Sequence, residues 1–322
     1  MKIFVTGGAG YIGSICVEEL LNARHQVFVI DNLSEGHRQA VDARAEFLEG
    51  DLGDRELLFK TLQSMRPNAV MHFSGNALVP ESMANPGKYF ANNVANGINL
   101  LEACRHAGVN KLVFSSTCAI FGLPKKVPIG EIAPKRPINP YGESKLMFER
   151  ILEWYDRQHG LRSVCLRYFN AAGATRNFGE HHREETHLIP NVLKVALGQR
   201  PHAEIFGTDY PTPDGTCIRD YIHIVDLAHA HMLALQCEKS DVFNLGSGDG
   251  YSVRQVVDTT RRVTGHPIPV VERPRRAGDP PRLVADSTKI RKVLGWKPRF
   301  DSLDAIIDSA WQWHRTYPNG YD

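Results

Sequence analysis

Short apolar runs alternate with longer amphipathic stretches through the first half of the chain. The apolar runs are rich in β-branched residues, as is typical of strands that are buried on both faces of a parallel sheet. They cover Lys2–Val5, Val27–Ile30, Glu46–Leu48, Ala69–Phe73, Lys111–Ser115 and Ser163–Arg167. Stretches with the helical period lie between them, at Ser14–Ala23, Arg55–Met65, Asn96–His106 and Gly142–Gln158. This alternation predicts repeated βαβ units, and therefore an α/β fold with a doubly wound parallel sheet.

The pattern changes after Asn170, where proline and glycine become frequent and the apolar runs become isolated. Short runs remain at Glu204–Phe206, Val242–Leu245 and Ile268–Val271, and a late helical stretch lies near Ser287–Leu294. We therefore expect two domains. The sheet domain comprises 1–170, to which 221–245 return, and a smaller α/β lobe comprises 171–220 and 246–322.

Three glycines, Gly7, Gly10 and Gly13, follow the first strand directly and open the first helix. Glycine permits a tight turn and lets backbone amides approach a pyrophosphate at the helix N-terminus. Asp31 ends the second strand, where a carboxylate accepts hydrogen bonds from ribose hydroxyls and repels a 2′-phosphate. This context predicts a Rossmann-type domain that binds NAD rather than NADP. A structural turn with a surface aspartate is the alternative.

Asp51 follows the third apolar run and has two possible roles. It can reach an adenine amino group, or it can cap the helix that starts near Arg55.

Tyr141 and Lys145 are spaced i, i+4 at the start of a predicted helix, so they share one face. Asn139 and Pro140 are typical of the N-cap and first position of a helix. A nearby ammonium lowers a tyrosine pKa, which makes Tyr141 a candidate acid–base group. Thr117 ends the strand before it, at an edge where ligands bind in such sheets.

Composition narrows the choice of partners. The 322 residues carry a formal net charge of +2, which gives no general attraction to nucleic acid. Six scattered cysteines without a C-x-x-C pair indicate reduced thiols rather than disulfides or zinc ligands. The N-terminus runs straight into a strand, and no apolar run reaches membrane-spanning length. We expect a cytoplasmic protein with neither nucleic-acid nor membrane partners.

Three histidines, His181, His182 and His187, lie close together in the second half. Their spacing matches no standard metal motif, so we expect a loop over a ligand and no metal.

These features resemble the UDP-glucose 4-epimerase family of the extended short-chain dehydrogenase/reductase superfamily, over nearly the whole chain. The motifs of the first half are Thr6–Ser14, Asp31–Leu33, Gly50–Leu52, His72–Phe73, Asn92–Val94, Phe114–Thr117, Tyr141–Lys145 and Arg167–Gly173. The more specific motifs of the second half are His187–Pro190, Ile205–Tyr210, Arg219–His223, Asn244–Gly246 and Arg275–Asp279.

The resemblance implies an NAD-dependent isomerase that inverts C4 of a UDP-hexose through a 4-keto sugar. Tyr141 would exchange the hydroxyl proton, Thr117 would assist by hydrogen bonding, and Lys145 would hold the ribose and tune Tyr141. The implied NAD contacts are Gly7, Gly10, Tyr11, Ile12, Gly13, Asp31, Asn32, Asp51, Leu52, Phe73, Asn92, Tyr141, Lys145 and Phe169. The implied UDP-sugar contacts are Thr117, Asn170, His187, Leu188, Glu204, Ile205, Phe206, Arg219, Tyr221, Arg276, Asp279 and Leu283.

Two finer expectations follow from the resemblance. Leu283 lies where some relatives carry a bulky tyrosine, so we expect room for an N-acetyl group, as in UDP-GlcNAc and UDP-GalNAc. We also expect a homodimer packed through helices near 92–106 and 143–158.

Several alternatives remain open. A sugar-nucleotide dehydratase or decarboxylase would need acid–base residues where Cys118 and Ala119 follow Thr117, and neither side chain serves that role. A UDP-uronate 4-epimerase shares the same C4 chemistry. A non-catalytic NAD-binding scaffold on this fold is more distant, because Thr117, Tyr141 and Lys145 are all present.

Overall fold

The computed structural model describes residues 1–276 and 278–322. The chain divides into two compact units. Unit 1 comprises Met1–Gly122, Pro134–Arg167 and Ala228–Phe243. Unit 2 comprises Leu123–Ala133, Tyr168–Leu227 and Asn244–Asp322.

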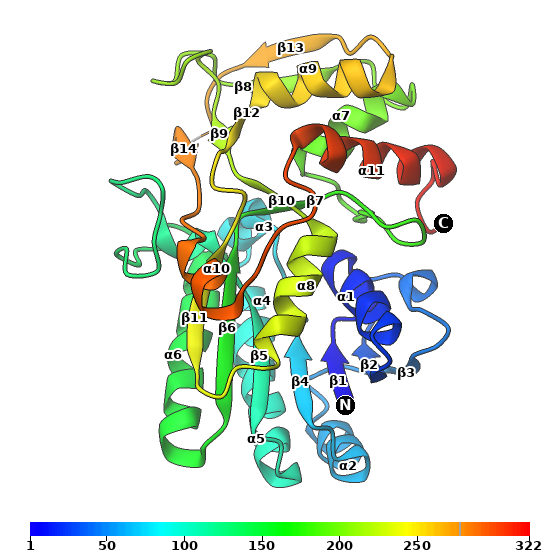
Figure 1. Ribbon diagram of the computed structural model, residues 1–322, viewed down its shortest axis with the longest axis vertical. Coiled ribbons are helices and arrows are strands. Elements are labelled where there is room, and N and C mark those ends of the chain that lie inside the picture. Colours follow the sequence, from blue (N-terminus) through cyan, green and yellow to red (C-terminus); the bar gives the residue numbers. More distant parts are fainter. Residues whose placement is uncertain (277) are drawn as a thin grey trace. The chain divides into compact units, whose positions relative to one another are not determined.

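A seven-stranded sheet in the order β11-β6-β5-β4-β1-β2-β3 organises unit 1 (Figure 1). Every pairing from β3 to β5 is parallel. The chain builds outward from β1 to β3, returns to the other side of β1 for β4, and continues outward. The order therefore reverses between β1 and β4, which is where doubly wound sheets bind ligands at the carboxyl ends of their strands. The strands are β1 Lys2–Thr6, β2 Gln26–Asp31, β3 Glu46–Glu49, β4 Ala69–His72, β5 Lys111–Thr117, β6 Arg162–Tyr168 and β11 Asp241–Leu245.

Helices cover both faces of this sheet. Phe4, Phe28 and Phe114 point to one face, where they form a core with apolar residues of α2, α5 and α6. Because side chains alternate along a strand, Ile3 and Val5 point to the other face, where α1 contacts β1 and β2. The helical segments are α1 Tyr11–Asn22, η1 Arg38–Ala40, α2 Arg55–Met65, α3 Val79–Ala84, α4 Pro86–Phe90, η2 Ala91–Ala95, α5 Asn96–Ala107, η3 Cys118–Phe121, α6 Pro140–His159 and α8 Ile224–Ala234.

Unit 2 contains three small sheets and a separate helical core. Trp311 and Ile307 of α11 pack with Val256 of α9 and Val192 of α7 in this core. The sheets pair β10 with β7, β13 with β8, and β12 and β14 with β9. The elements are β7 Asn170–Ala172, α7 Leu188–Ala196, β8 Ala203–Phe206, β9 Ile218–Arg219, β10 Tyr221–His223, β12 Tyr251–Ser252, α9 Val253–Thr264, β13 Val270–Arg273, β14 Arg282–Leu283, α10 Thr288–Leu294 and α11 Leu303–Thr316.

The predicted α/β fold with its doubly wound parallel sheet is confirmed, and most element bounds differ from the predictions by one to three residues. The run at 268–271 shifts as a whole by two residues, because its strand begins only at Val270. Two prolines flank Ile268, and proline has no N–H to donate to a strand ladder. Within the described residues, no helix is both long enough and apolar enough to cross a membrane.

Candidate active site

The glycine turn leaves space for backbone atoms that side chains would fill. Gly7 has a φ of +74°, and a Cβ atom there would lie 2.5 Å from the backbone nitrogen of Ser74. A Cβ at Gly13 would lie 2.1 Å from the carbonyl oxygen of Gly7. Gly10 is the N-cap residue of α1 and makes no side-chain cap. This backbone-lined helix N-terminus, with Tyr11 and Ile12 as its first residues, fits the pyrophosphate of a dinucleotide.

Asp31 lies directly beside this turn. One carboxylate oxygen accepts a hydrogen bond from the Ala9 amide at 3.0 Å, and the other accepts one from the Leu33 amide at 2.9 Å. Burial raises the pKa of Asp31, and the two backbone donors partly offset this effect. The carboxylate thus sits at the carboxyl end of β2, where the sequence analysis expects a ribose.

Asp51 does not cap the following helix, because the N-cap of α2 is Asp54, whose side chain accepts from the Leu57 amide. One Asp51 oxygen instead accepts from the Asn32 amide at 2.5 Å, and the other accepts from the Gly53 amide at 2.6 Å. The helix-cap alternative is therefore wrong. Asn32 and Asp51, two predicted NAD contacts, are brought together, and the carbonyl oxygen of the neighbouring Leu52 accepts from Asn99.

Tyr141 sits in the first turn of α6. Asn139 caps that helix by accepting from the Gly142 amide at 2.8 Å. The Tyr141 ring packs edge-on against the Tyr89 ring, with centroids 6.4 Å apart. Burial raises the pKa of Tyr141 to about 12, although a hydrogen bond with Thr117 acts in the opposite direction. In the protein alone the pKa shift is thus opposite to the lowering predicted from the sequence.

Lys145 lies one helical turn further and is almost fully buried. Its ammonium donates to the Ser115 carbonyl at 3.0 Å and lies 4.8 Å from the centre of the Phe114 ring. Burial lowers the pKa of Lys145 to about 8, and the charge of Glu149 partly opposes this shift. Lys145 is therefore close to its titration point at physiological pH.

A turn of π-helix, η2, carries Asn92 and ties its neighbour Asn93 to α6. The Asn93 amide donates to Ser144 Oγ and to the Asn76 carbonyl, each at 3.0 Å. Such turns are frequent at functional sites. Phe73 follows β4 and packs against His231.

Sequence reasoning missed a buried ion pair beneath these residues. Glu149 and Arg167 are joined at 2.5 Å and 2.9 Å, with side chains 4% and 2% exposed. Glu149 also accepts from the Ser116 hydroxyl at 2.6 Å. Three consecutive residues of β5 therefore hydrogen-bond to three successive turns of α6. The pairs are Thr117 with Tyr141, Ser115 with Lys145, and Ser116 with Glu149. The i, i+4, i+8 spacing of these helix residues was the available signal.

In unit 2, Asn170 and Tyr221 pair directly across β7 and β10. The Asn170 side chain donates to the Asp220 carbonyl at 2.8 Å. Phe169 donates its amide to Leu245, which holds the chain just before β7.

Arg219 and Leu283 are register partners across β9 and β14. The Arg219 guanidinium forms an ion pair with Asp279 and donates to the Ile218 carbonyl at 2.8 Å. Three predicted substrate contacts thus form one group. The Arg219 side chain is 13% exposed and that of Asp279 is 30% exposed, so both can reach solvent.

Two residues of β8 contact arginines that follow in the chain at or just after β13. Glu204 pairs with Arg273 at 2.9 Å across β8 and β13. The Arg276 guanidinium stacks over the Phe206 ring, 4.0 Å from its centre. Ile205 between them is buried. Arg273 was not among the predicted contacts, although its register opposite Phe206 places it on the same sheet.

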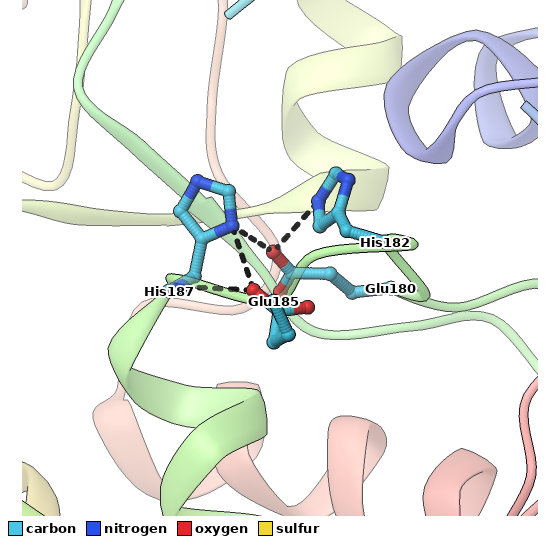
Figure 2. A group of neighbouring side chains, drawn as sticks. All are labelled: Glu180, His182, Glu185 and His187. Carbon is cyan, nitrogen blue, oxygen red and sulfur yellow. Dashed lines mark hydrogen bonds and ion pairs between the residues drawn. The ribbon is translucent and has the colours of Figure 1, made fainter. Parts of the chain in front are cut away.

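The histidine-rich loop before α7 brings together a different set than the sequence suggested. His182 and His187 converge with Glu180 and Glu185 (Figure 2). His181 instead contacts Tyr321. Burial lowers the pKa of His187, but the charges and hydrogen bonds of both glutamates together raise it to about 10. His187 is also the N-cap residue of α7, and Leu188 is its first helical residue.

Comparison with known proteins identifies the family. Residues 3–246 match the model of the NAD dependent epimerase/dehydratase family. The chain belongs to this family. It is 51% identical to UDP-glucose 4-epimerase of Lacticaseibacillus casei, with 100% of this chain and 99% of the relative covered.

Solved structures agree with this assignment. A crystal structure of a UDP-glucose 4-epimerase has a TM-score of 0.98 and 48% identity, and both chains are covered completely. The Bifidobacterium longum UDP-glucose 4-epimerase in complex with NAD+ and UDP has a TM-score of 0.94 and 37% identity, covering 99% of this chain and 100% of that chain. The predicted family, the Rossmann-type fold, the isomerase class and NAD as the cofactor are confirmed.

Proposed function

We propose that the chain interconverts UDP-glucose and UDP-galactose as an NAD-dependent 4-epimerase. The observation that carries the proposal is the packing of β5 against α6 in a family member, where Thr117 hydrogen-bonds Tyr141 and the backbone of Ser115 binds Lys145. The full-length identity of 51% to a UDP-glucose 4-epimerase supports the choice of substrate.

The residues of unit 1 fit NAD. The glycine turn and the N-terminus of α1 receive the pyrophosphate, Asp31 the ribose, and Asn32 with Asp51 the adenosine end. Tyr11, Ile12, Leu52, Phe73 and Asn92 of unit 1, together with Phe169 of unit 2, complete the proposed contacts. The proposed NAD-binding domain comprises 1–170 and 221–245, with 171–220 and 246–322 as the UDP-sugar lobe.

Tyr141 is the proposed acid–base group that transfers the proton of the C4 hydroxyl. Bound NAD supplies hydride acceptance from C4 and hydride return to the opposite face of the sugar. Tyr141 takes the hydroxyl proton as C4 becomes a ketone and gives it back when the alcohol forms again. A pKa of about 12 is too high for an efficient base near neutral pH, so nearby positive charge must stabilise the phenolate. We assign this charge to Lys145, which lies one turn further along α6 and donates to the Ser115 carbonyl. Thr117 holds the phenol by a hydrogen bond.

The remaining proposed contacts hold the UDP group. Arg219 and Arg276 offer planar guanidinium donors suited to a diphosphate. The other proposed contacts are Asn170, His187, Leu188, Glu204, Ile205, Phe206, Tyr221, Asp279 and Leu283. Leu283, a register partner of Arg219, favours acceptance of UDP-GlcNAc and UDP-GalNAc as a second substrate pair.

The expected homodimer, through helices near 92–106 and 143–158, remains part of the proposal. We also propose a cytoplasmic location, which the free cysteines support because thiols stay reduced there.

The decisive experiment follows the anomeric proton of UDP-galactose by NMR. The protein should produce UDP-glucose, and Tyr141→Phe should lower kcat about 10²–10⁴-fold, the range typical of a lost acid–base group. Turnover of UDP-uronates alone would favour the uronate epimerase. Bound NAD without turnover of any UDP-sugar would favour a scaffold and refute the proposal.

A further inference from the structure

Four side chains of metal-ligand type converge in the irregular segment between β7 and α7. Figure 2 shows Glu180, His182, Glu185 and His187 pointing toward one another. One atom from each side chain lies within 4.8 Å of the corresponding atoms of the others. These residues span only 180–187 and come from loop backbone rather than from a shared helix or strand.

The spacing of these atoms is that of a small coordination sphere. Glu180 Oε1 lies 2.9 Å from His187 Nδ1 and 3.3 Å from His182 Nε2. His187 Nδ1 lies 3.1 Å from Glu185 Oε1. In a tetrahedral zinc site with bonds of about 2.0–2.2 Å, ligand atoms are about 3.3–3.6 Å apart. Binding an ion would therefore open the close pairs by a few tenths of an ångström and draw in any pair nearer the 4.8 Å limit.

The donor set and its burial favour a transition metal. The Glu180 and Glu185 side chains are only 6% and 3% exposed, so their charges lie largely out of water. A divalent cation bound by both carboxylates would balance both charges. Magnesium and calcium prefer sites made of oxygen ligands, whereas two imidazoles with two carboxylates suit zinc. From this arrangement we infer that Glu180, His182, Glu185 and His187 bind one zinc ion.

The site has both an approach and a mechanical role. A surface hollow lined by Glu180 and Glu185 leads to the carboxylates. The loop is fixed at one end, where the Gly179 amide donates to Tyr321 Oη at 3.0 Å. At the other end His187 occupies the N-cap position of α7 and precedes Leu188. Zinc would cross-link the loop and thereby fix the start of α7, a segment that the proposed function assigns to UDP-sugar binding.

Metal content tests the site without any use of activity. Tag-free protein is stripped with a chelator, equilibrated with zinc chloride, passed through gel filtration and measured by mass spectrometry. We expect one zinc per chain and a melting temperature several degrees above that of the stripped protein, because zinc binds the folded state. Cobalt(II) in place of zinc should give the strong visible absorption of a tetrahedral site.

Matched variants locate the ion. Glu185→Gln and His182→Gln each remove one ligand with little change in size, and each should weaken zinc binding more than tenfold. Glu184→Gln is the control, because this exposed glutamate lies in the same loop outside the cluster. The inference is overturned if less than a tenth of the chains retain zinc. It is equally overturned if the ligand variants bind zinc as well as the control does. The zinc would then be bound elsewhere, and the two glutamate charges would be balanced by protonated histidines.

The mechanical role rests on the proposed function and has its own readout. Zinc removal should raise the KM for UDP-galactose several-fold and leave kcat nearly unchanged, and an unaltered KM would overturn this role. The two proposals fail separately. Tyr141→Phe should lower kcat as predicted above and retain zinc. A parent protein without turnover that still binds zinc through Glu185 would refute only the epimerase.

Discussion

Buried hydrogen bonds between β5 and α6 fix the side chains around Tyr141 in unit 1, whereas the charged residues of β8 and β13 in unit 2 pair with one another at the surface. Glu149 and Arg167 are 4% and 2% exposed, but Glu204 and Arg273 are 32% and 46% exposed. A buried pair holds one geometry, because breaking it leaves an uncompensated charge. An exposed pair costs little to break, so its members can exchange partners for a ligand.

This difference suggests a division of labour. The proposed proton transfer needs atoms held within a few tenths of an ångström, and the network from Ser115 to Thr117 provides this. Binding of a diphosphate needs donors that can leave their resting partners, as Arg219 can leave Asp279. Each of the following experiments changes either a buried contact of unit 1 or a proposed ligand contact of unit 2.

The largest expected effect comes from Glu149→Gln. Glutamine has nearly the same shape and can still accept from Ser116, but it leaves the Arg167 charge buried without its partner. We expect a loss of about 3–5 kcal/mol in the free energy of unfolding, measured by urea denaturation. Glu153→Gln, on the exposed side of α6, is the control. If both variants lose equally little, the buried network does not hold this region.

A second experiment separates the proposed catalytic role of Lys145 from the stability that is lost by burying its charge. Burial holds the pKa of Lys145 at about 8, below its ordinary 10.5, so the unfolded state binds more protons between these pH values. Stability therefore rises with pH across this window. Lys145→Met removes the buried charge and should be more stable than the parent at pH 7, by an amount on the order of 3 kcal/mol before the lost Ser115 contact is subtracted. It should also lose turnover.

The pH dependence is the sharper part of this prediction. The stability advantage of Lys145→Met should shrink as the pH rises from 8 to 10.5, because the parent then folds with neutral Lys145 at less cost. Urea midpoints of both proteins across this range measure it. A constant difference would mean that Lys145 does not titrate in this window.

The sequence predicted unit 1 far better than unit 2, for a physical reason. Gly7, Asp31 and Tyr141 belong to local motifs whose geometry follows from a strand, a turn and a helix start. Their placement required no knowledge of distant contacts. Glu149 with Arg167 went unnoticed because the pair joins a helix to a later strand and becomes visible only once β5 and β6 are adjacent.

The predicted UDP-sugar contacts of unit 2 came from family resemblance and not from local pattern. Arg219 and Asp279 are 60 positions apart and meet only through β9 and β14. The direction of the Tyr141 pKa shift was wrong for a related reason. The sequence reveals that a lysine lies four residues away, but it does not reveal that burial dominates the Tyr141 pKa or that the opposing contribution comes from Thr117.

A third prediction tests whether Arg219, whose side chain is 13% exposed, binds substrate without contributing to chemistry. Arg219→Ala should raise the KM for UDP-galactose about 10–100-fold, equivalent to the 1.5–3 kcal/mol of a charge-assisted hydrogen bond, while kcat changes little. Arg275→Ala is the matched control, since Arg275 pairs with Asp209 and lies outside the proposed contacts. A fall in kcat with constant KM would mean that Arg219 acts in the chemical step, and the proposed division between the two units would be wrong.

The smallest expected effect is a change of selectivity at Leu283. This residue is half-buried beside Arg219, and a tyrosine there would fill space that the proposal reserves for an N-acetyl group. Leu283→Tyr should therefore lower kcat/KM for UDP-GalNAc about tenfold relative to UDP-galactose, within the 1–3 kcal/mol that a pocket gains from steric discrimination. Leu283→Met, which adds no ring, is the control. Equal effects on both substrates would show that position 283 does not face C2 of the sugar, and selectivity would then have to be sought elsewhere in unit 2.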